Sequence, residues 1–302
     1  MNRIIIDTDP GVDDALAIAF ALSSPLDVIG VSTVFGNSSV ADSTQNALTI
    51  VDLLEKNTPV YAGARRPMNG KSKRASSHGK NGLGGLELKT NRTQQQAGAQ
   101  KFIVEQLRSA NEPIDIVAIG PATNIALILK NYPDVVANIG QVVVMAGVID
   151  AAGNITDKAE FNAYNDPLAL QIVLSAPIRT VLIPADVCRK VVFTTDVFNR
   201  IRNEGMRDAM LKLTAAYITY YQQNDDFETF EGGVMYDLLA VAYILNPTLF
   251  TTINSEVRVN LDGGPDYGMT TLGDSKAGSL VARDVDASRV KGLFLATLNG
   301  TI

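Results

Sequence analysis

The densest group of chemically active residues lies at positions 7–14, which read DTDPGVDD. Asp7, Asp9, Asp13 and Asp14 here fall between a short apolar run and a helical pattern. Two carboxylates about 4 Å apart repel by roughly 4 kcal/mol at an effective dielectric constant of about 20, so a converging set requires a cation or raised pKa values. Because all-oxygen ligands select hard cations, this segment predicts a site for Ca²⁺ or Mg²⁺.

A simpler interpretation of the same residues is structural. Asp13 and Asp14 favour the positive end of a helix, and Asp7 and Asp9 would then lie in solvent. However, the Pro-Gly pair between them predicts a tight turn that brings Asp9 back toward the other two. We therefore prefer the functional interpretation for the whole cluster.

Further polar residues follow other apolar runs. Gly36-Asn37, residues 120–124 and Ala146-Gly147 each come after a predicted strand, where ligands bind in open α/β sheets. Each alone is typical of a turn or a helix cap, as Thr123 before an apolar helix would be, but together they predict a pocket. A later stretch adds carboxylate and amide groups that suit a polyhydroxylated ligand such as a sugar: Asn154, Glu160, Asn162, Asn165 and Asp166.

Asp237 is an acidic residue within an otherwise apolar segment, residues 235–243. An isolated buried aspartate is costly, so this side chain needs a partner. Two roles remain open at this point. Asp237 either caps a helix that follows Gly232-Gly233 or is a further metal ligand.

Hydrophobic periodicity predicts the elements that position these residues. Runs typical of buried parallel strands occur at residues 4–6, 28–34, 114–119, 142–145 and 180–183. Helical patterns alternate with them at residues 15–22, 46–54, 97–109, 125–130 and 167–174. Helical patterns at 206–223 and 234–245, strand patterns at 255–261 and 280–285, and a closing helix follow. This order predicts a doubly wound α/β fold with a Rossmann-like core, in one domain over residues 1–302.

Residues 65–96 collect Gly, Ser, Lys, Asn and Thr with almost no apolar periodicity, which predicts a long loop. This loop contains the single histidine, His78, followed by the glycine-rich residues 79–85. Loops of this length in compact domains are usually either lids or disordered segments. We therefore predict an active-site loop here.

Composition excludes several classes of function. The 302 residues are 46% hydrophobic and 19% charged, which is typical of a globular protein. With 26 basic and 32 acidic residues, and a net charge of -6, the chain has no basic stripe for nucleic acid. A single cysteine, Cys188, excludes an intrachain disulfide and a cysteine-cluster zinc site, and a single histidine excludes a multi-histidine metal site. We recognise no signal peptide and no apolar run near the roughly 20 residues of a membrane span, and therefore expect a cytoplasmic protein.

Residues 7–15 resemble the amino-terminal motif Asp-Thr-Asp-Pro-Gly-x-Asp-Asp-Ala of the inosine-uridine type nucleoside hydrolases. The resemblance is specific because it continues, in the family's order, through Gly36-Asn37, His78-Gly79, residues 120–126, Met145, residues 160–162, Asp166-Pro167, Asp186 and residues 237–243. It implies an open, mostly parallel sheet flanked by helices, with one Ca²⁺ at the carboxyl ends of the strands. It also implies hydrolysis of the N-glycosidic bond of ribonucleosides, in nucleoside salvage or catabolism, by a homodimer or homotetramer.

The same resemblance implies a role for each matching residue. It implies that Ca²⁺ is held by Asp9, Asp14, Asp237 and the main-chain carbonyl of Thr123, and that Asp9 takes a proton from the Ca²⁺-bound water that attacks the ribose. The implied substrate contacts are Asp13, Asn37, Met145, Asn154, Glu160 and Asn162, together with His78, which would close over the ligand. Carboxylates under the ribose suit this reaction, because cleavage develops oxocarbenium character.

One position departs from the family pattern. Many members have a histidine before the last metal-binding aspartate and use it to protonate the departing base, whereas this chain has Tyr236. A phenol with a pKa of about 10 matches pH 7 less well than an imidazole near 6.5. Tyr236 either stacks on the base, donates a proton weakly, or leaves protonation of the base to another group or to water. The simplest structural interpretation of Tyr236 is core packing. Candidates for a base pocket just upstream are Tyr220, Tyr221, Phe227 and Phe230.

Three hypotheses for the function follow. The leading one is a Ca²⁺-dependent ribonucleoside hydrolase. The second is a Ca²⁺-dependent ribose- or nucleoside-binding protein with weak or no turnover, because Tyr236 replaces the histidine. The third, a phosphotransferase of the haloacid dehalogenase type, rests on Asp7-x-Asp9 after a strand. We rank it lowest, because Asp13 and Asp14 would repel a phosphate at the helix start.

Overall fold

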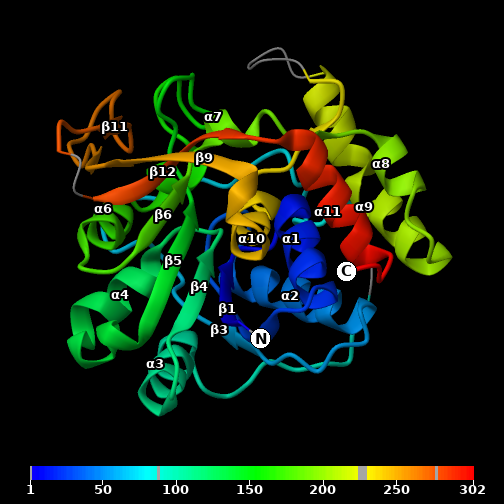
Figure 1. Cartoon of the computed structure of the whole chain (residues 1–302), viewed down its shortest axis with the longest axis horizontal. Coiled ribbons are helices and arrows are strands. Elements are labelled where there is room, and N and C mark those ends of the chain that lie inside the picture. Colours follow the sequence, from blue (N-terminus) through cyan, green and yellow to red (C-terminus); the bar gives the residue numbers. More distant parts are fainter. Residues whose placement is uncertain (1, 87–88, 224–229, 276–277) are drawn as a thin grey trace.

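An eight-stranded sheet forms the framework of the computed structural model, which describes residues 2–86, 89–223, 230–275 and 278–302 (Figure 1). From edge to edge the strands are β3 (Val60–Ala62), β2 (Asp27–Thr33), β1 (Arg3–Thr8), β4 (Ile114–Ala118), β5 (Ile139–Met145), β6 (Thr180–Ile183), β12 (Ser279–Val285) and β9 (Phe250–Ser255). Neighbouring strands pair in parallel, except β12 and β9, which pair antiparallel. The predicted α/β fold with an open, mostly parallel sheet is therefore confirmed.

Helices cover both faces of the sheet because side chains alternate along each strand. Ile4 and Ile6 of β1 pack in one core with α1 (Val12–Ser23), α2 (Val40–Leu53), α10 (Leu238–Leu245) and α11 (Ala287–Leu298). Ile5 faces the other core, with α3 (Ala99–Ser109), α4 (Thr123–Asn131) and α6 (Pro167–Ser175). A strand buried on both faces needs consecutive apolar residues, which explains the three isoleucines in a row.

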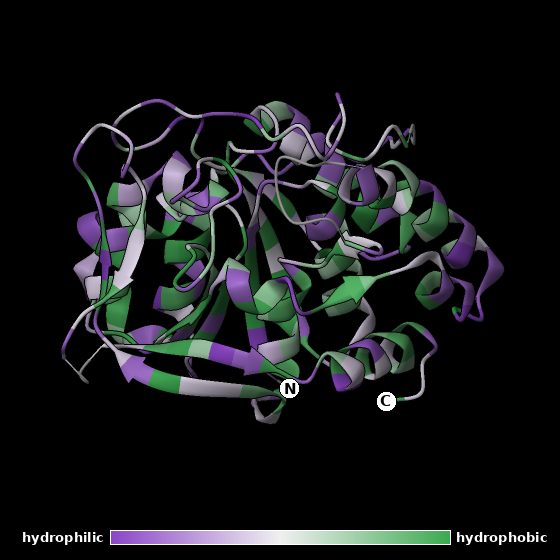
Figure 2. Ribbon diagram, turned by 90° about the horizontal axis from the view of Figure 1, so that it is seen from above, coloured by the Kyte–Doolittle hydropathy of each residue, from purple (hydrophilic) through white to green (hydrophobic). Residues whose placement is uncertain are grey.

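The remaining elements surround this framework. They are α5 (Phe161–Asn165), α7 (Ala185–Cys188), α8 (Thr195–Asn199), α9 (Glu204–Gln223), the 3₁₀ turns η1 (Pro133–Asn138) and η2 (Pro247–Leu249), and two antiparallel pairs, β7 (Val192–Phe193) with β8 (Gly233–Val234) and β10 (Val257–Val259) with β11 (Thr270–Leu272). Figure 2 shows hydrophobic residues along the strands of the sheet and hydrophilic residues on the peripheral loops. No helix in the described part of the chain is long and apolar enough to cross a bilayer.

Some sequence-predicted boundaries differ from the structure. The helix predicted at residues 234–245 begins only at Leu238, because Val234 pairs with Val192 of β7. The strand predicted at 255–261 is two elements, since β9 ends at Ser255 and β10 begins at Val257 in a different sheet. In short apolar runs, periodicity does not separate strand from helix. The long loop agrees with its prediction, since the described residues 65–86 and 89–96 form no helix or strand.

Helix α11 closes one face of the molecule through Phe294, which is fully buried. The Phe294 ring lies 5.6 Å from that of Phe20 on α1 and 5.1 Å from that of Phe193, both in edge-on contact. This cluster joins the carboxyl-terminal helix to the helix that carries the acidic motif.

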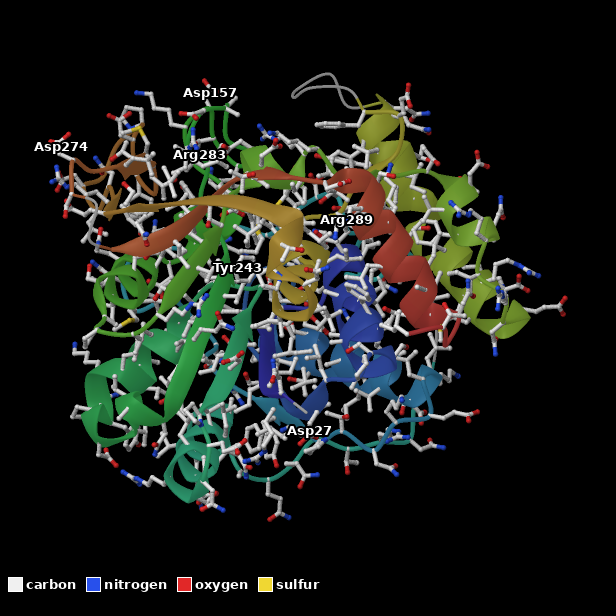
Figure 3. The ribbon with its side chains drawn as sticks, viewed as in Figure 1. Asp27, Asp157, Tyr243, Asp274, Arg283 and Arg289 are labelled. Atoms are coloured by element: carbon white, nitrogen blue, oxygen red, sulfur yellow. The ribbon has the colours of Figure 1, made fainter. Side chains whose placement is uncertain are left out.

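We predict that Phe294→Ala lowers the free energy of unfolding by about 3–5 kcal/mol, because it leaves a cavity among rings that have little freedom to collapse. Urea unfolding of the purified protein measures this change. The control is Arg289→Ala, an exposed position on the same helix (Figure 3), which should change stability by less than about 0.5 kcal/mol. Equal effects of the two substitutions would contradict the assigned packing.

Candidate active site

The acidic motif lies where β1 turns into α1. Asp13 and Asp14 occupy the first turn of α1, and Asp237 directly precedes α10, a helix that packs against α1. Each of these three residues offers a carboxylate oxygen within 4.8 Å of the others, and all three are buried. Residues far apart in the sequence therefore form one acidic cluster.

Asp14 is held by hydrogen bonds from three donors. Its Oδ1 accepts from the Thr8 hydroxyl at 2.5 Å, and its Oδ2 accepts from the Gly11 amide at 2.9 Å and the Asn37 side-chain amide at 3.1 Å. The Gly11 contact is also the cap of α1. Burial raises the pKa of Asp14, and the hydrogen bonds from Thr8 and Gly11 lower it. The fold therefore fixes the direction of this carboxylate.

Asp9 lies beside the cluster with one oxygen fixed and the other without a partner. Its Oδ2 accepts from the Asn37 amide at 2.6 Å, whereas Oδ1 has no hydrogen-bond partner among the described residues. Burial and then the charge of Asp14 raise its pKa. Two glycines make room for this carboxylate. A Cβ at Gly120 would lie 2.6 Å from Oδ1, and one at Gly36 would overlap Oδ2.

Asp13 and Asp237 complete the group. Burial and the charge of Asp14 raise the pKa of Asp13 to about 8, and its Oδ1 has no hydrogen-bond partner in the described structure. Burial raises the pKa of Asp237 too, followed by the charges of Asp13, Asp14 and Asp9. Unpartnered buried carboxylate oxygens are costly, and this all-oxygen set fits a hard divalent cation.

The position of Asp237 tests one of its two predicted roles, that of a helix cap. It occupies the N-cap position of α10, but its side chain makes no capping hydrogen bond. The carboxylate instead contacts that of Asp14. The side chain of Asp237 therefore does not cap α10, and its role as a metal ligand stays a prediction.

Thr123 is the first residue of α4 rather than its cap, a position that Ala122 takes. The Thr123 hydroxyl donates to Asp166 at 2.6 Å, and Asp166 also accepts from the amide of Met68 in the long loop at 2.8 Å. The Asp166 side chain therefore connects α4 to the long loop. A role for the Thr123 carbonyl as a metal ligand stays a prediction.

A cavity of about 260 Å³ opens above the acidic cluster. Its lining contains every predicted substrate contact that the structure describes, namely Asp13, Asn37, His78, Met145, Asn154, Glu160 and Asn162, and also Tyr236 and Asp237. Of the base-pocket candidates, Tyr220, Tyr221 and Phe230 line it, while Phe227 lies outside the described residues. Asp9, Asp14 and Thr123 do not line the cavity and are buried.

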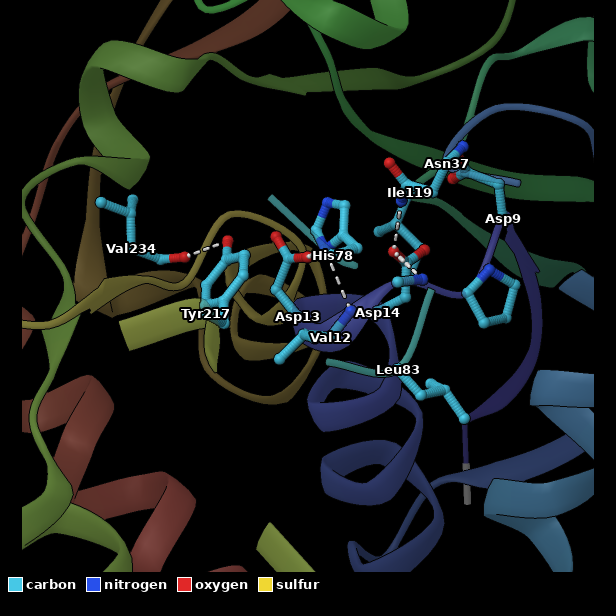
Figure 4. Close-up of polar contacts among 12 residues, drawn as sticks. Asp9, Val12, Asp13, Asp14, Asn37, His78, Leu83, Ile119, Tyr217 and Val234 are labelled. Atoms are coloured by element: carbon cyan, nitrogen blue, oxygen red, sulfur yellow. Dashed lines mark hydrogen bonds and ion pairs between the residues drawn. The ribbon is translucent and has the colours of Figure 1, made fainter. Parts of the chain in front are cut away.

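The long loop brings His78 against the start of α1, as Figure 4 shows. The His78 Nδ1 accepts from the Val12 amide at 3.1 Å, which places the proton of the neutral ring on Nε2. Its ring stacks on Tyr217 with centroids 5.3 Å apart. Burial lowers the pKa of His78 to about 4, so the ring is neutral at pH 7.

Glu160 and Asn162 shape the opposite wall of the cavity. Glu160 caps α5, and its carboxylate accepts from the amides of Gly147, Asn162 and Ala163. Burial raises the pKa of Glu160 to about 7. The Asn162 side-chain amide donates to the carbonyls of Ile119 and Met145 at 3.0 Å each. Its Oδ1 has no hydrogen-bond partner among the described residues and remains an acceptor.

Sequence reasoning missed Arg189, a half-buried cation in the cavity lining. Arg189 directly follows α7, a single helical turn that begins just after the carboxyl end of β6. Its place after a parallel strand could have identified Arg189 from the sequence, because polar residues after the other parallel strands were recognised for the same reason.

Comparisons with known proteins agree with this geometry. The model of the family described as "Inosine-uridine preferring nucleoside hydrolase" matches residues 4–292. The pyrimidine-specific ribonucleoside hydrolase RihA of Shigella boydii is 35% identical over 294 residues, which cover 94% of each chain. Among solved structures, the plant nucleoside hydrolase PpNRh1 has a TM-score of 0.92 at 29% identity, and the purine-preferring ribonucleoside hydrolase from Gardnerella vaginalis has 0.91 at 30%. Each covers 99% of both chains.

These matches over the full fold define an N-glycosyl hydrolase of the ribonucleoside hydrolase class. The chain belongs to the inosine-uridine preferring nucleoside hydrolase family.

We predict that Gly120→Ala weakens the binding of a divalent cation at this cluster at least about tenfold, because the added methyl group displaces the Asp9 carboxylate. Calorimetric titration of the metal-free protein measures the affinity. Gly292→Ala is the matched control, since a Cβ there meets nothing within 4 Å. Unchanged affinity in Gly120→Ala would contradict the close contact between Gly120 and Asp9.

The buried acids also predict how stability depends on pH. Asp7, Asp13 and Glu160 have pKa values raised by burial to about 6, 8 and 7. The folded protein therefore binds protons that the unfolded chain has already lost, so the metal-free protein loses stability as pH rises from about 4 to about 8. We expect a loss of at least about 2 kcal/mol between pH 5 and pH 8 in urea unfolding with chelator. The slope should be shallower in Asp13→Asn, and a metal-free protein more stable at pH 8 than at pH 5 would contradict this account.

Proposed function

We propose that this protein hydrolyses the N-glycosidic bond of ribonucleosides with the help of one bound Ca²⁺, releasing free base and ribose. The observation that carries the proposal is the buried cluster of carboxylates under the cavity, with unpartnered oxygens on Asp9 and Asp13. A cluster of this kind needs a cation, and its position at the strand ends matches the site expected in an open α/β sheet.

The proposed Ca²⁺ ligands are Asp9, Asp14, Asp237 and the carbonyl of Thr123. Asp13 lies close enough to share in the site, since its carboxylate belongs to the group within 4.8 Å. These residues would hold a Ca²⁺ that, when bound, would offset their charge, lower the pKa of a coordinated water and offer a ligand position to the ribose hydroxyls.

Asp9 is the proposed general base. Its Oδ2 is occupied by the Asn37 amide, which leaves Oδ1 to accept a proton from the attacking water. The water oxygen bonds to C1′ of the ribose as the bond from C1′ to the base breaks. The ring gains positive charge in this transition state, so the surrounding carboxylates stabilise it more than the neutral substrate.

The cavity walls supply groups for the ribose hydroxyls. The acceptor Oδ1 of Asn162 and the unpartnered oxygen of Asp13 are the proposed hydroxyl partners. Asn37, Asn154 and Glu160 are proposed to complete the polar surface, with Met145 and His78 enclosing the sugar. Glu160 has a second task, because its carboxylate accepts from the backbone amide of Asn162 at 2.9 Å and so holds that residue in place.

The base is proposed to occupy the aromatic side of the cavity, beside Tyr221, Phe230 and Tyr236. Burial raises the pKa of Tyr236, which makes it a weak acid near pH 7. This observation also supports the second candidate function, a Ca²⁺-dependent nucleoside-binding protein with little turnover. The relatives named above include pyrimidine-specific and purine-preferring enzymes, so both kinds of base belong in the test. Homodimer or homotetramer assembly, a cytoplasmic location and a role in nucleoside salvage stay predictions.

We predict release of base from at least one of inosine, uridine, cytidine, adenosine, guanosine and xanthosine in the presence of Ca²⁺. Chelator should abolish release, and Asp9→Asn should reduce kcat by about 100-fold or more, because the proton acceptor is lost. Chromatography of the released base is the measurement, with exposed Asp27→Asn as the control. Tight nucleoside binding without any release would instead support the binding protein, and Tyr236→His should then restore turnover.

A further inference from the structure

Arg189 places a half-buried positive charge in the cavity lining, which also contains acidic groups and aromatic rings. A second arginine of the lining, Arg74 in the long loop, is exposed. One guanidinium nitrogen, Nη2, donates to the carbonyl of Gly153 at 3.0 Å. The guanidinium also lies close enough to Glu160 and to the Tyr236 hydroxyl to act on both. Since a guanidinium has five N–H donors, one anchored nitrogen leaves several that can serve the site.

The Tyr236 hydroxyl lies within hydrogen-bonding reach of the Tyr221 hydroxyl and of the Arg189 guanidinium. A guanidinium can only donate, so the Tyr236 oxygen is the acceptor in that contact. The rings of Tyr221 and Tyr236 lie 6.3 Å apart, which fits this arrangement. A phenol oxygen that accepts from a guanidinium keeps its own O–H as a donor, and the accepted bond polarises that O–H further.

Tyr236 belongs to the end of the cavity proposed for the base. It lines the cavity together with Tyr221 and Phe230, while its neighbour Asp237 belongs to the acidic cluster. One short segment therefore places a metal-side carboxylate next to a base-side phenol. Arg189 lies within reach of the phenol oxygen and lines the same cavity.

Resting on the proposed hydrolase function, we propose that Arg189 is a positioning residue that acts through the Tyr236 hydroxyl to stabilise the departing base. When the bond between C1′ and the base breaks, both electrons move to the base, which becomes an anion that accepts a hydrogen bond from Tyr236. The oxygen of the attacking water bonds to C1′, and one of its protons passes to Asp9. The base then takes a proton from solvent, and Asp9 returns its proton to solvent.

This role makes the effect of Arg189 depend on the leaving group. A nucleobase is a poor leaving group, so its departure benefits from a stabilised negative charge. The nitrophenolate that leaves p-nitrophenyl β-D-ribofuranoside is stable by itself, and its departure needs little help. The two substrates share the ribose, so they separate leaving-group stabilisation from ribose binding and water activation.

The test compares kcat/KM for these two substrates in wild type, Arg189→Met, Arg189→Lys and Tyr236→Phe. We expect Arg189→Met and Tyr236→Phe each to lose about 100-fold on the best ribonucleoside and less than about fivefold on the nitrophenyl riboside. Arg189→Lys should recover part of the loss because it keeps the charge. The double variant should be no worse than the poorer single variant, because both substitutions interrupt one path.

Lys190→Met is the matched control, because Lys190 is exposed and pairs with Asp284 rather than with the cavity. Circular dichroism and Ca²⁺ titration check that each variant is folded, and Tyr236→Phe tests the same path if Arg189→Met does not fold. Equal losses on both substrates would overturn this proposal alone and assign Arg189 to holding Gly153. Wild-type protein that cleaves neither substrate would overturn the hydrolase function and this proposal with it.

Discussion

Mutual repulsion among buried carboxylates is the constraint on which the rest of this site depends. Asp9, Asp13, Asp14 and Asp237 are each almost wholly removed from solvent, and burial raises the pKa of all four. The charges of neighbouring aspartates raise the pKa values of Asp9, Asp13 and Asp237 further. Bringing such residues together without a counter-ion lowers the stability of the folded protein. A divalent cation bound between them removes this repulsion, and its binding stabilises the folded state. The fold therefore favours the binding of a cation at the base of its cavity.

The surrounding structure determines which carboxylate oxygens are available to a ligand. Backbone and side-chain donors from Thr8, Gly11 and Asn37 fix some carboxylate oxygens, and the unpartnered oxygens of Asp9 and Asp13 are left for other ligands. The carboxyl ends of parallel strands supply these donors from several loops at once, so the chemistry rests on a rigid edge of the sheet. Farther up the cavity the charge changes sign at Arg189, beside the aromatic rings. One pocket thus presents negative charge where the ribose is proposed to gain positive charge, and positive charge where the base is proposed to leave.

Sequence reasoning predicted the part of this arrangement that is local or repeated. The motif at residues 7–14 contains its own turn and helix start, and the alternation of buried strands with helices defines the sheet, so both were predictable. Asp237 was recognised as a candidate, but its direction toward Asp14 depends on the packing of α10 against α1, which no local pattern encodes. Arg189 was missed for the same reason, because its partners Gly153 and Tyr236 are distant in sequence. The early start assigned to the helix at residue 234 reflects an apolar run that pairs as a strand with β7.

Calorimetric titration of Ca²⁺ into the metal-free protein at pH 7, in two buffers with different ionisation enthalpies, tests the central claim most directly. The account predicts one site per chain and a net release of protons, because carboxyl groups with raised pKa values must ionise to bind the metal. It also predicts that Asp14→Asn and Asp237→Asn abolish this binding. A protein that binds no Ca²⁺, or that binds it without proton release and equally well in both variants, would contradict the account.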